Sequence, residues 1–374
     1  MYLKMKGRLL IVTSEFPPYP GGIGNHAYNL AKQLVKNKFN VTVIAPRNSK
    51  IEDNIFDSRN EFTTKRYIDI RFIKIFMILS TISISIFKNR GKILIATGQL
   101  SLFCTSIFSK LFFIKSIAIF HGHELRYGNR VIVFLLKILI IQFDKIIAVS
   151  KFSKDCGLEI NSKMKINIIN NGFDSKRFND VPKKVYVKSN ALKLITLGSL
   201  SYRKGQHNVI SSLPYLQKKY GSVQYEMIGN PYLETVLFKQ AEQLNVHKAI
   251  KFHGVLNDRD LKKILLCADI FVMLSENVDY GDVEGFGIAI LEANYLGLPA
   301  IGSIGCGIED AISDGFNGKL INSKRPDDLY TASQDILNNY RRYSKNSIEW
   351  ARARTWAKVI DKYLNEIKIQ QNHR

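Results

Sequence analysis

The chain of 374 residues has few cysteines, no long apolar run and few acidic residues in its first half. Its four cysteines are far apart in the sequence and form neither a CxxC pair nor a short cluster with histidine. This spacing disfavours a structural zinc site and a disulfide scaffold, and it suits a reducing compartment.

No segment reaches the roughly twenty mainly apolar residues that a membrane-spanning helix needs. The most membrane-like stretch, residues 75–87, is uncharged and mostly apolar but too short. The apolar run at residues 9–13 is also too short for the core of an export signal, and no cleavage site of small residues follows it. We therefore expect a cytoplasmic protein that does not cross a membrane.

Length and composition indicate a folded protein of two domains. A chain of this length is about twice one ordinary domain. Its hydrophobic fraction of 46% is that of a packed globular protein and excludes a disordered chain.

The positive charge lies almost entirely in one half. Residues 1–190 contain 31 Lys and Arg against 12 Asp and Glu, whereas residues 191–374 contain 23 against 20. A genome-wide bias toward lysine would give both halves a similar excess of positive charge. The first half is therefore expected to face something anionic, such as phospholipid headgroups, a phosphorylated substrate or nucleic acid. We expect no nucleic-acid partner, because no binding motif and no platform of aromatic and basic residues accompanies the charge.

Two apolar stretches of the basic half, residues 71–87 and 131–143, are interrupted by single lysines. This pattern suits a helix that lies in a membrane interface with its lysine stems extended toward water. An ordinary core helix is the alternative for both.

Strand and helix signals alternate along the chain, which predicts parallel sheets. The apolar runs expected to be strands are residues 9–13, 41–45, 93–96, 116–120, 145–149 and 166–169 in a first series and 192–197, 224–228, 250–253, 270–273 and 299–302 in a second. Two series predict an α/β fold of two Rossmann-like domains that face each other across a central cleft. A polar stretch at 181–190 is the expected linker. We place the domains at 1–187 and 188–350, followed by a C-terminal helix at 351–374 that packs back on the first domain.

Ligands of open parallel sheets bind beyond the carboxyl ends of the strands, so the loops there are the candidate sites. The loop after the first strand contains Gly21 and Gly22 beside a helix start, where free backbone amides suit phosphate; a tight turn without ligand is the alternative. His121 follows another strand and has His123 two residues on, but a third metal ligand at a convincing spacing is missing. His121 is therefore a candidate substrate contact, or a structural residue.

The second domain opens with a similar loop that contains Arg203 and Lys204. Cations near a helix start are unfavourable unless an anion such as a diphosphate lies between them; solvated surface charges are the alternative. Glu284 and Glu292 lie in a glycine-containing, otherwise apolar segment and are expected to be half-buried. A helical spacing would separate them by about 12 Å, beyond the roughly 5–9.5 Å of glycosidase carboxylate pairs. They are therefore expected to bind two parts of one ligand.

Taken together, the motifs resemble the retaining glycosyltransferases of GT-B family 4, the group 1 glycosyltransferases, almost from end to end. They are Pro-Pro-x-x-Gly-Gly at 17–22, Ala-Val-Ser at 148–150, Asn-Gly-Phe-Asp at 171–174, Lys-Gly at 204–205, Phe-His-Gly at 252–254, Ala-Asp-Ile-Phe-Val at 268–272, Glu-x7-Glu at 284–292 and Gly-x-Pro at 297–299. The Glu-x7-Glu segment, in this order with the others, is highly specific.

The resemblance implies a role for each matching residue. Gly21 and Gly22 would donate backbone N–H groups to the donor diphosphate, which Arg203 and Lys204 would neutralise. The other implied contacts are Glu284 and the backbone of Phe286, Gly287 and Ile288 with the donor sugar, Glu292 with the ribose, the backbone near Val255 with the nucleobase, and His121 with the reacting sugar and acceptor. It also implies that the enzyme needs no metal and no cofactor.

One position departs from the family pattern. The family usually has Gly-Arg where this chain has Gly198-Ser199. Either Arg203 supplies the missing charge, or the diphosphate is held more weakly.

The expected function is transfer of a sugar from UDP- or GDP-sugar, with retention, to a lipid-linked or growing surface polysaccharide acceptor. The basic first domain favours an enzyme bound peripherally to an anionic membrane at the inner face of the cell membrane. The alternatives are a GT-B enzyme with a soluble small-molecule acceptor and a catalytically weakened nucleotide-sugar-binding subunit of an assembly complex.

Overall fold

The computed structural model describes residues 6–19, 21–70, 73–87, 92–122, 124, 130–178, 180–182, 184–186, 190–278 and 283–372. The chain divides into two compact units. The first unit consists of Met1–Gly172 and Trp356–Arg374, and the second of Phe173–Thr355. Each unit is described by itself.

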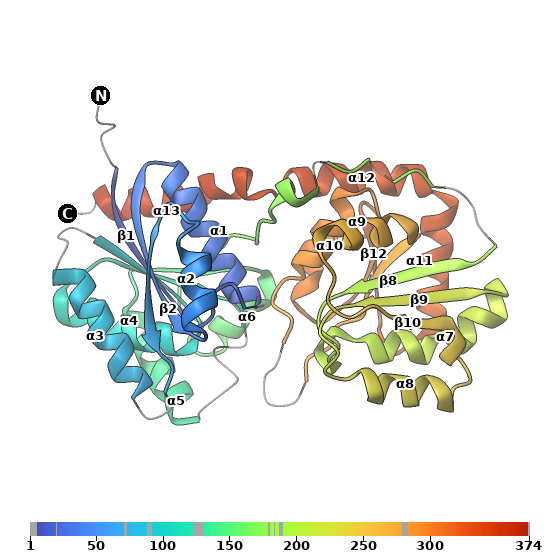
Figure 1. Cartoon of the computed structure of the whole chain (residues 1–374), viewed down its shortest axis with the longest axis horizontal. Helices are drawn as coiled ribbons and strands as arrows, with labels where there is room; N and C mark the ends of the chain where they lie inside the picture. Colours follow the sequence, from blue (N-terminus) through green and yellow to red (C-terminus); the bar gives the residue numbers. More distant parts are fainter. Residues whose placement is uncertain are drawn as a thin grey trace. The chain divides into compact units, whose positions relative to one another are not determined.

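The described part of the first unit contains a seven-stranded parallel sheet in the order β3-β2-β1-β4-β5-β6-β7 (Figure 1). Its strands are β1 (Gly7–Thr13), β2 (Phe39–Arg47), β3 (Thr63–Ile68), β4 (Lys92–Thr97), β5 (Ser116–Phe120), β6 (Lys145–Ala148) and β7 (Ile166–Ile168). The central strands are nearly continuous apolar runs because helices cover both faces of the sheet.

Helices α1 and α13 lie on one side of this sheet, and α3, α4 and α5 lie on the other (Figure 1). The helices of the unit are α1 (Gly22–Lys36), α2 (Lys50–Asp57), α3 (Lys74–Phe87), α4 (Gln99–Phe112), α5 (Arg130–Leu139), α6 (Lys151–Leu158) and α13 (Trp356–Asn372). The last of these brings the C-terminal end of the chain back to pack on α1.

The described part of the second unit contains a six-stranded parallel sheet in the order β10-β9-β8-β11-β12-β13. Its strands are β8 (Leu192–Leu197), β9 (Val223–Ile228), β10 (Ile250–Phe252), β11 (Ile270–Met273), β12 (Ala300–Ser303) and β13 (Gly318–Ile321). Its helices are α7 (Gln206–Tyr220), α8 (Glu234–Gln243), α9 (Asp258–Cys267), α10 (Ile288–Tyr295), α11 (Pro326–Asn338) and α12 (Tyr340–Arg352). Helices α7 and α8 lie on one side of the sheet, and α9 and α10 on the other (Figure 1).

The predicted fold class is confirmed, since each unit is an α/β layer structure around a parallel sheet. Strands β3 and β13 were absent from the prediction. Both lie at the edge of their sheet, and an edge strand does not need the continuous apolar run by which central strands are detected.

The C-terminal helix expected at 351–374 corresponds to α13, which starts at Trp356 and packs on α1 of the first unit, as predicted. A break at residues 353–355 separates it from α12. At the break Thr355 bridges to Phe173, and the backbone N–H of Phe173 donates to the carbonyl oxygen of Arg354 at 3.2 Å. The first and last residues of the second unit, Phe173 and Thr355, therefore lie side by side.

The division at Gly172 and Phe173 also differs from the boundary expected at 187/188, of which residues 187–189 lie outside the described ones. Residues between the two positions pack on the second unit. The backbone N–H of Lys184 donates to the carbonyl oxygen of Leu296 at 2.8 Å, and the ring of Tyr186 stacks on Tyr340 with centroids 4.2 Å apart. The polar composition of the expected linker therefore reflects an irregular segment of the second unit.

Candidate functional site

The loop between β8 and α7 holds Arg203 and Lys204 in a fixed place. Both lie in the short helical turn η4 (Tyr202–Lys204), and the next residue, Gly205, has a φ of +73°. A Cβ atom at Gly205 would lie 1.7 Å from the carbonyl oxygen of Leu274, so glycine alone permits this approach to the end of β11. The backbone N–H of Glu276 donates to the carbonyl oxygen of Arg203 at 3.2 Å and closes the loop against that strand end.

Glu284 joins the two cations in one cluster. Its Oε2 lies 2.8 Å from Nζ of Lys204 and also accepts from Nη1 of Arg203. Its Oε1 accepts from the backbone N–H of Gly287 at 3.2 Å. We call Arg203, Lys204 and Glu284 the charge cluster; its three side chains are partly or fully buried.

The charge cluster keeps Glu284 ionised. Burial by itself would raise the pKa of this carboxyl, but the charges of Lys204 and Arg203 outweigh burial and lower the pKa to about 2. At neutral pH the carboxylate therefore accepts hydrogen bonds and does not serve as a proton donor. One carboxylate against two cations leaves a net positive charge in the cluster, which suits an anionic ligand.

The backbone around Glu284 is fixed by its neighbours. Its carbonyl oxygen accepts from the backbone N–H of Gly307 at 2.9 Å, and the side chain of Phe286 is buried. Gly287 has a φ of +82° and precedes α10, whose first residue is Ile288. The helical spacing expected between Glu284 and Glu292 is therefore wrong, because residues 284–287 form a loop before the helix.

Glu292 lies within α10, where Arg177 is its partner. Nη1 of Arg177 donates to Oε1 of Glu292 at 2.7 Å, and its Nη2 lies 2.6 Å from Oδ1 of Asp258. Burial raises the pKa of Glu292, while the positive charges of Arg177 and Lys204 oppose the rise. Because the charge of Lys204 lowers the pKa of Glu292, Glu292 lies within electrostatic range of the charge cluster.

The sequence prediction missed Arg177. Its only signal was indirect: Arg177 follows the Asn-Gly-Phe-Asp motif by three residues, and the buried carboxylate of Glu292 requires a positive partner from somewhere in the fold. No local pattern shows which cation this is, because 115 positions separate the two residues.

Two further predicted donor residues lie at strand exits of the second unit. Ser199 follows β8, and its carbonyl oxygen accepts from Nε2 of Gln206 at 3.2 Å. Val255 follows β10, and its side chain is largely exposed.

In the first unit, Gly21 and Gly22 stand at the start of α1. No side chain caps this helix end, and a Cβ atom on Gly22 would meet nothing within 4 Å. The carboxylate of Glu15 lies beside Gly21, where an added Cβ would be 2.1 Å from its Oε2. The expected phosphate loop therefore has an open helix start with an anion at its edge.

His121 follows β5, as predicted, and is only 6% exposed. Its Nε2 lies 2.9 Å from the hydroxyl of Thr97, and its backbone N–H donates to Oε1 of Glu124 at 2.7 Å. Its ring packs against His26 with centroids 5.0 Å apart. His123 lies outside the described residues.

The prediction missed His26 as the neighbour of His121. Nε2 of His26 lies 2.8 Å from the hydroxyl of Tyr363 on α13, and its ring also packs against Trp356. Burial lowers the pKa of His26 to about 3, so its ring is neutral near pH 7. The available signal was the helical spacing of His26 from Ile23 and Leu30, which places all three on one side of α1.

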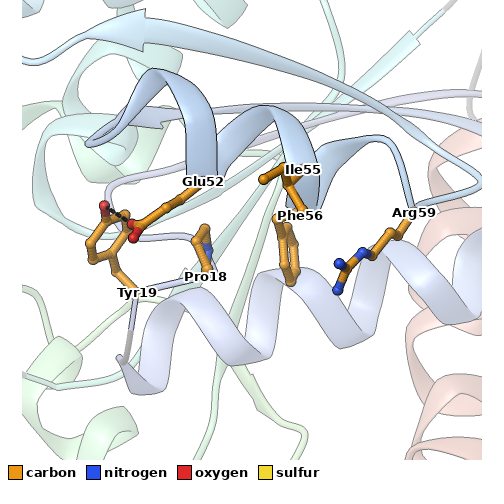
Figure 2. A pocket seen from close by; sticks show the side chains of 6 residues that line it. All are labelled: Pro18, Tyr19, Glu52, Ile55, Phe56 and Arg59. Carbon is orange, nitrogen blue, oxygen red and sulfur yellow. Dashed lines mark hydrogen bonds between the residues drawn. The ribbon is translucent and has the colours of Figure 1, made fainter.

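A surface hollow of about 380 Å³ lies between the loop after β1 and helix α2 (Figure 2). Its lining residues are Pro18, Tyr19, Glu52, Ile55, Phe56 and Arg59. The hydroxyl of Tyr19 donates to Oε2 of Glu52 at 2.7 Å.

Among the residues that the structure describes, no three His, Cys, Asp or Glu side chains are grouped so as to hold a metal ion. The charge cluster offers cations for phosphate and an ionised carboxylate for hydroxyl groups. This arrangement suits a ligand that carries both.

Two family models match adjacent parts of the chain. Residues 20–177 match the model described as glycosyltransferase family 4, and residues 178–354 match glycosyl transferases group 1. The chain belongs to the group 1 glycosyltransferases. Their GT-B architecture agrees with the two parallel-sheet units described above.

Individual relatives are distant and differ in how much of the chain they cover. The GDP-mannose-dependent α-(1-6)-phosphatidylinositol monomannoside mannosyltransferase of Mycolicibacterium smegmatis is 25% identical over 93% of each chain. A putative colanic acid biosynthesis glycosyltransferase of Escherichia coli is 27% identical over 42% of this chain and 38% of its own length. The crystal structure of HepE from Anabaena, in complex with UDP and glucose, superimposes with a TM-score of 0.77 at 16% identity, covering 97% of this chain and 99% of that one.

Proposed function

We propose that this glycosyltransferase transfers a sugar, with retention of configuration, from a UDP- or GDP-sugar to a lipid-linked or growing surface polysaccharide acceptor. The observation that carries the proposal is the charge cluster, in which two cations and one ionised carboxylate meet at the exits of parallel strands. A nucleotide sugar has the matching pair of features, since it carries a diphosphate and sugar hydroxyls.

In the proposed reaction, the bond between the anomeric carbon and the diphosphate oxygen breaks, and a bond to the acceptor oxygen forms on the same face. The departing oxygen accepts the proton of the acceptor hydroxyl. Arg203 and Lys204 stabilise the negative charge that develops on the diphosphate. Because these cations are fixed at the strand ends before the donor arrives, little reorganisation is needed.

The remaining donor contacts are proposed from the resemblance to the family. Glu284 and the backbone of Phe286, Gly287 and Ile288 would hold sugar hydroxyls, and the low pKa of Glu284 supports its role as a hydrogen-bond acceptor. The other proposed contacts are Glu292 with the ribose, Val255 with the nucleobase, Gly21 and Gly22 with the diphosphate, and His121 with the reacting sugar and acceptor.

We propose that Arg203 supplies the charge that the family usually places at the position of Ser199. Its guanidinium bonds the same carboxylate oxygen that Lys204 approaches, so both cations lie at one point. A ligand phosphate that reaches Lys204 would therefore also be within reach of Arg203.

The acceptor is proposed from the first unit and from the relatives. The names of two relatives specify a phosphatidylinositol mannoside and colanic acid biosynthesis. The first 190 residues of this chain have a net charge of +19, which suits a lipid phosphate or an anionic membrane surface. We therefore place the enzyme in the cytoplasm, bound peripherally to the inner face of the cell membrane, and we expect it to act without metal. No described helix is both long and apolar enough to span a bilayer.

The test is a panel of UDP- and GDP-sugars in a thermal unfolding assay of the full chain. A donor at a hundred times its Kd stabilises a protein by about 2.7 kcal/mol, so one strong hit would identify sugar and base together. We expect that hit to disappear in Lys204→Ala and to persist in Lys251→Ala, which removes an exposed lysine of the same unit. A donor that stabilises both variants equally would contradict the assignment of the charge cluster as the donor site.

A further inference from the structure

Large apolar side chains are exposed on the outer side of helices α3, α4 and α5 in the first unit. Phe113, the residue after α4, is 93% exposed, and Phe76 on α3 is 68% exposed. We call this surface the α3–α5 face, defined by Phe76, Phe87, Phe113, Val131, Phe134 and Ile138. A globular protein rarely exposes so many large apolar residues in one region without a partner.

The three helices belong together on one side of the sheet (Figure 1). Their inner residues are buried against it, as Ile82 of α3 and Leu136 of α5 show. The rings of Phe87 and Phe112 lie 5.9 Å apart and connect the ends of α3 and α4. These helices are therefore apolar on both sides, one toward the core and one toward solvent.

On α5 the exposed residues follow one stripe. Val131, Phe134 and Ile138 are spaced three and four positions apart, so they share one side of the helix. Exposed Arg130 and Lys137 flank this stripe. The hydrocarbon part of a lysine or arginine side chain beside an apolar stripe can contact lipid chains while its charged group stays at the headgroups.

The charge of the segment has one sign. Residues 70–143 contain ten Lys and Arg and a single acidic residue, Glu124. Glu124 is 0% exposed, so its carboxylate does not contribute to the surface of the α3–α5 face. Repulsion of an anionic surface by exposed carboxylates is therefore absent across this segment.

We propose that the α3–α5 face docks on an anionic phospholipid bilayer, with its aromatic and aliphatic side chains inserted among the headgroups. The proposal deepens the proposed function, on which it rests for a lipid-linked acceptor, by naming the surface that meets the lipid. The positive charge favours an anionic bilayer as the partner, since each lysine or arginine near an anionic membrane strengthens binding about fivefold. Exposed aromatic side chains add apolar burial at the headgroup level.

The experiment is co-sedimentation of the full chain with two kinds of vesicle, one of phosphatidylcholine and one of phosphatidylcholine mixed with phosphatidylglycerol. The test variant combines Phe76→Glu, Phe113→Glu and Phe134→Glu. The matched control combines Val236→Glu and Phe238→Glu, which change exposed apolar residues of α8 in the second unit. A third variant combines Lys110→Glu and Lys137→Glu, which reverse two exposed charges of the same segment.

We expect salt-sensitive binding of the wild type and the control to the anionic vesicles. The aromatic variant should bind at least tenfold more weakly, and the lysine variant should lose its preference for anionic lipid. Circular dichroism and thermal stabilisation by the donor serve to show that the variants are folded. Equal binding by the aromatic variant and the control would overturn the assignment of this face.

Two other results separate this proposal from the proposed function. If the wild type binds a nucleotide sugar but no vesicle, the proposed docking on a bilayer is contradicted, while the proposed donor site is not. If the wild type binds anionic vesicles but no nucleotide sugar stabilises it, the proposed donor site is contradicted, while the role of the α3–α5 face is not. Dimers that dissociate in the aromatic variant, without any vesicle binding, would show that a second copy covers the face.

Discussion

The two units place their charged groups differently. In the second unit, charged side chains meet in and around the candidate site, where Glu284 pairs with Arg203 and Lys204, and Glu292 pairs with Arg177. In the first unit, the excess of cations is on the surface, while the histidines of its site pair with neutral hydroxyls. Paired charge in a partly buried site can be redistributed onto an ionic ligand, whereas surface charge acts on whatever approaches from outside.

This difference teaches what each unit is suited to bind. The carboxylates of the second unit already hold their cations at fixed points, which prepares the site for a diphosphate and hydroxyls. The first unit has a buried cluster of histidines and hydroxyls and an excess of cations, which suits a large anionic surface.

The charge cluster should dominate turnover. We expect Lys204→Ala and Arg203→Ala each to lower kcat tenfold or more, because each removes a cation from the leaving diphosphate. The measurement is steady-state transfer, or hydrolysis of the nucleotide sugar if no acceptor is at hand. Lys251→Ala, in the same unit but exposed, should keep full activity.

A different result would reassign the role of Arg203. If Ser199→Arg raised activity while Arg203→Ala had no effect, the charge missing at position 199 would be a true loss in this chain. Arg203 would then be a structural partner of Glu284 and not a substitute for the family arginine.

Loss of Arg177 should destabilise the second unit. Arg177→Ala would leave the buried carboxylate of Glu292 without its cation, at a cost of about 2 kcal/mol after allowance for the partial exposure of Arg177. Burial already raises the pKa of Glu292, and without Arg177 the pKa would rise further. A carboxyl with a raised folded-state pKa gains stability as pH falls, so the deficit of the variant should shrink from pH 7 to pH 5.

Urea unfolding of the two proteins at both pH values measures this effect. Asp258→Ala is the matched control, since it removes the exposed partner of the same arginine and should cost little. A deficit that does not change with pH would show that Glu292 is not the group left unpaired by the substitution.

The first unit should respond to pH through His26. Its pKa of about 3 lies below the ordinary value, so the unfolded chain takes up the proton first. The stability from neutral His26 is present above pH 6.5 and is lost progressively as pH falls. Between pH 7 and pH 5 we expect the wild type to lose about 2 kcal/mol more than His26→Gln.

Tyr363→Phe separates this titration from the hydrogen bond. It removes the hydroxyl that lies 2.8 Å from His26 and should lower stability at every pH without removing the slope. Equal slopes in the wild type and His26→Gln would mean that other groups govern the acid response.

Most of the fold was predictable because its strands are buried on both faces. Runs such as Leu9 to Val12 are apolar throughout, and few other structures produce a series of them between helices. The edge strands β3 and β13 were missed because partial exposure removes that signal. The break between α12 and α13 was missed because its cause, a bridge from Thr355 to Phe173, joins residues far apart in sequence.

The site was predictable where its residues are close in sequence or share a recognisable motif. Arg203 and Lys204 were found beside a glycine turn, and Glu284 and Glu292 in a glycine-containing apolar segment. Their pairing was not, because the carboxylate of Glu284 reaches cations 81 positions away. Arg177 lacked any local signal that distinguishes it from other basic residues, and the signal for His26 was only its spacing from Ile23 and Leu30 on one helix side.

The sequence by itself determined the two parallel sheets, the loops at their strand ends and the imbalance of charge between the halves. These depend on local periodicity and composition, which act over a few residues. Only the tertiary structure decided which cation meets which carboxylate, where the second unit begins, and that apolar residues of α3 and α5 are exposed. Such outcomes follow from chain crossings between distant segments, and burial is a property of the assembled fold and not of any single segment.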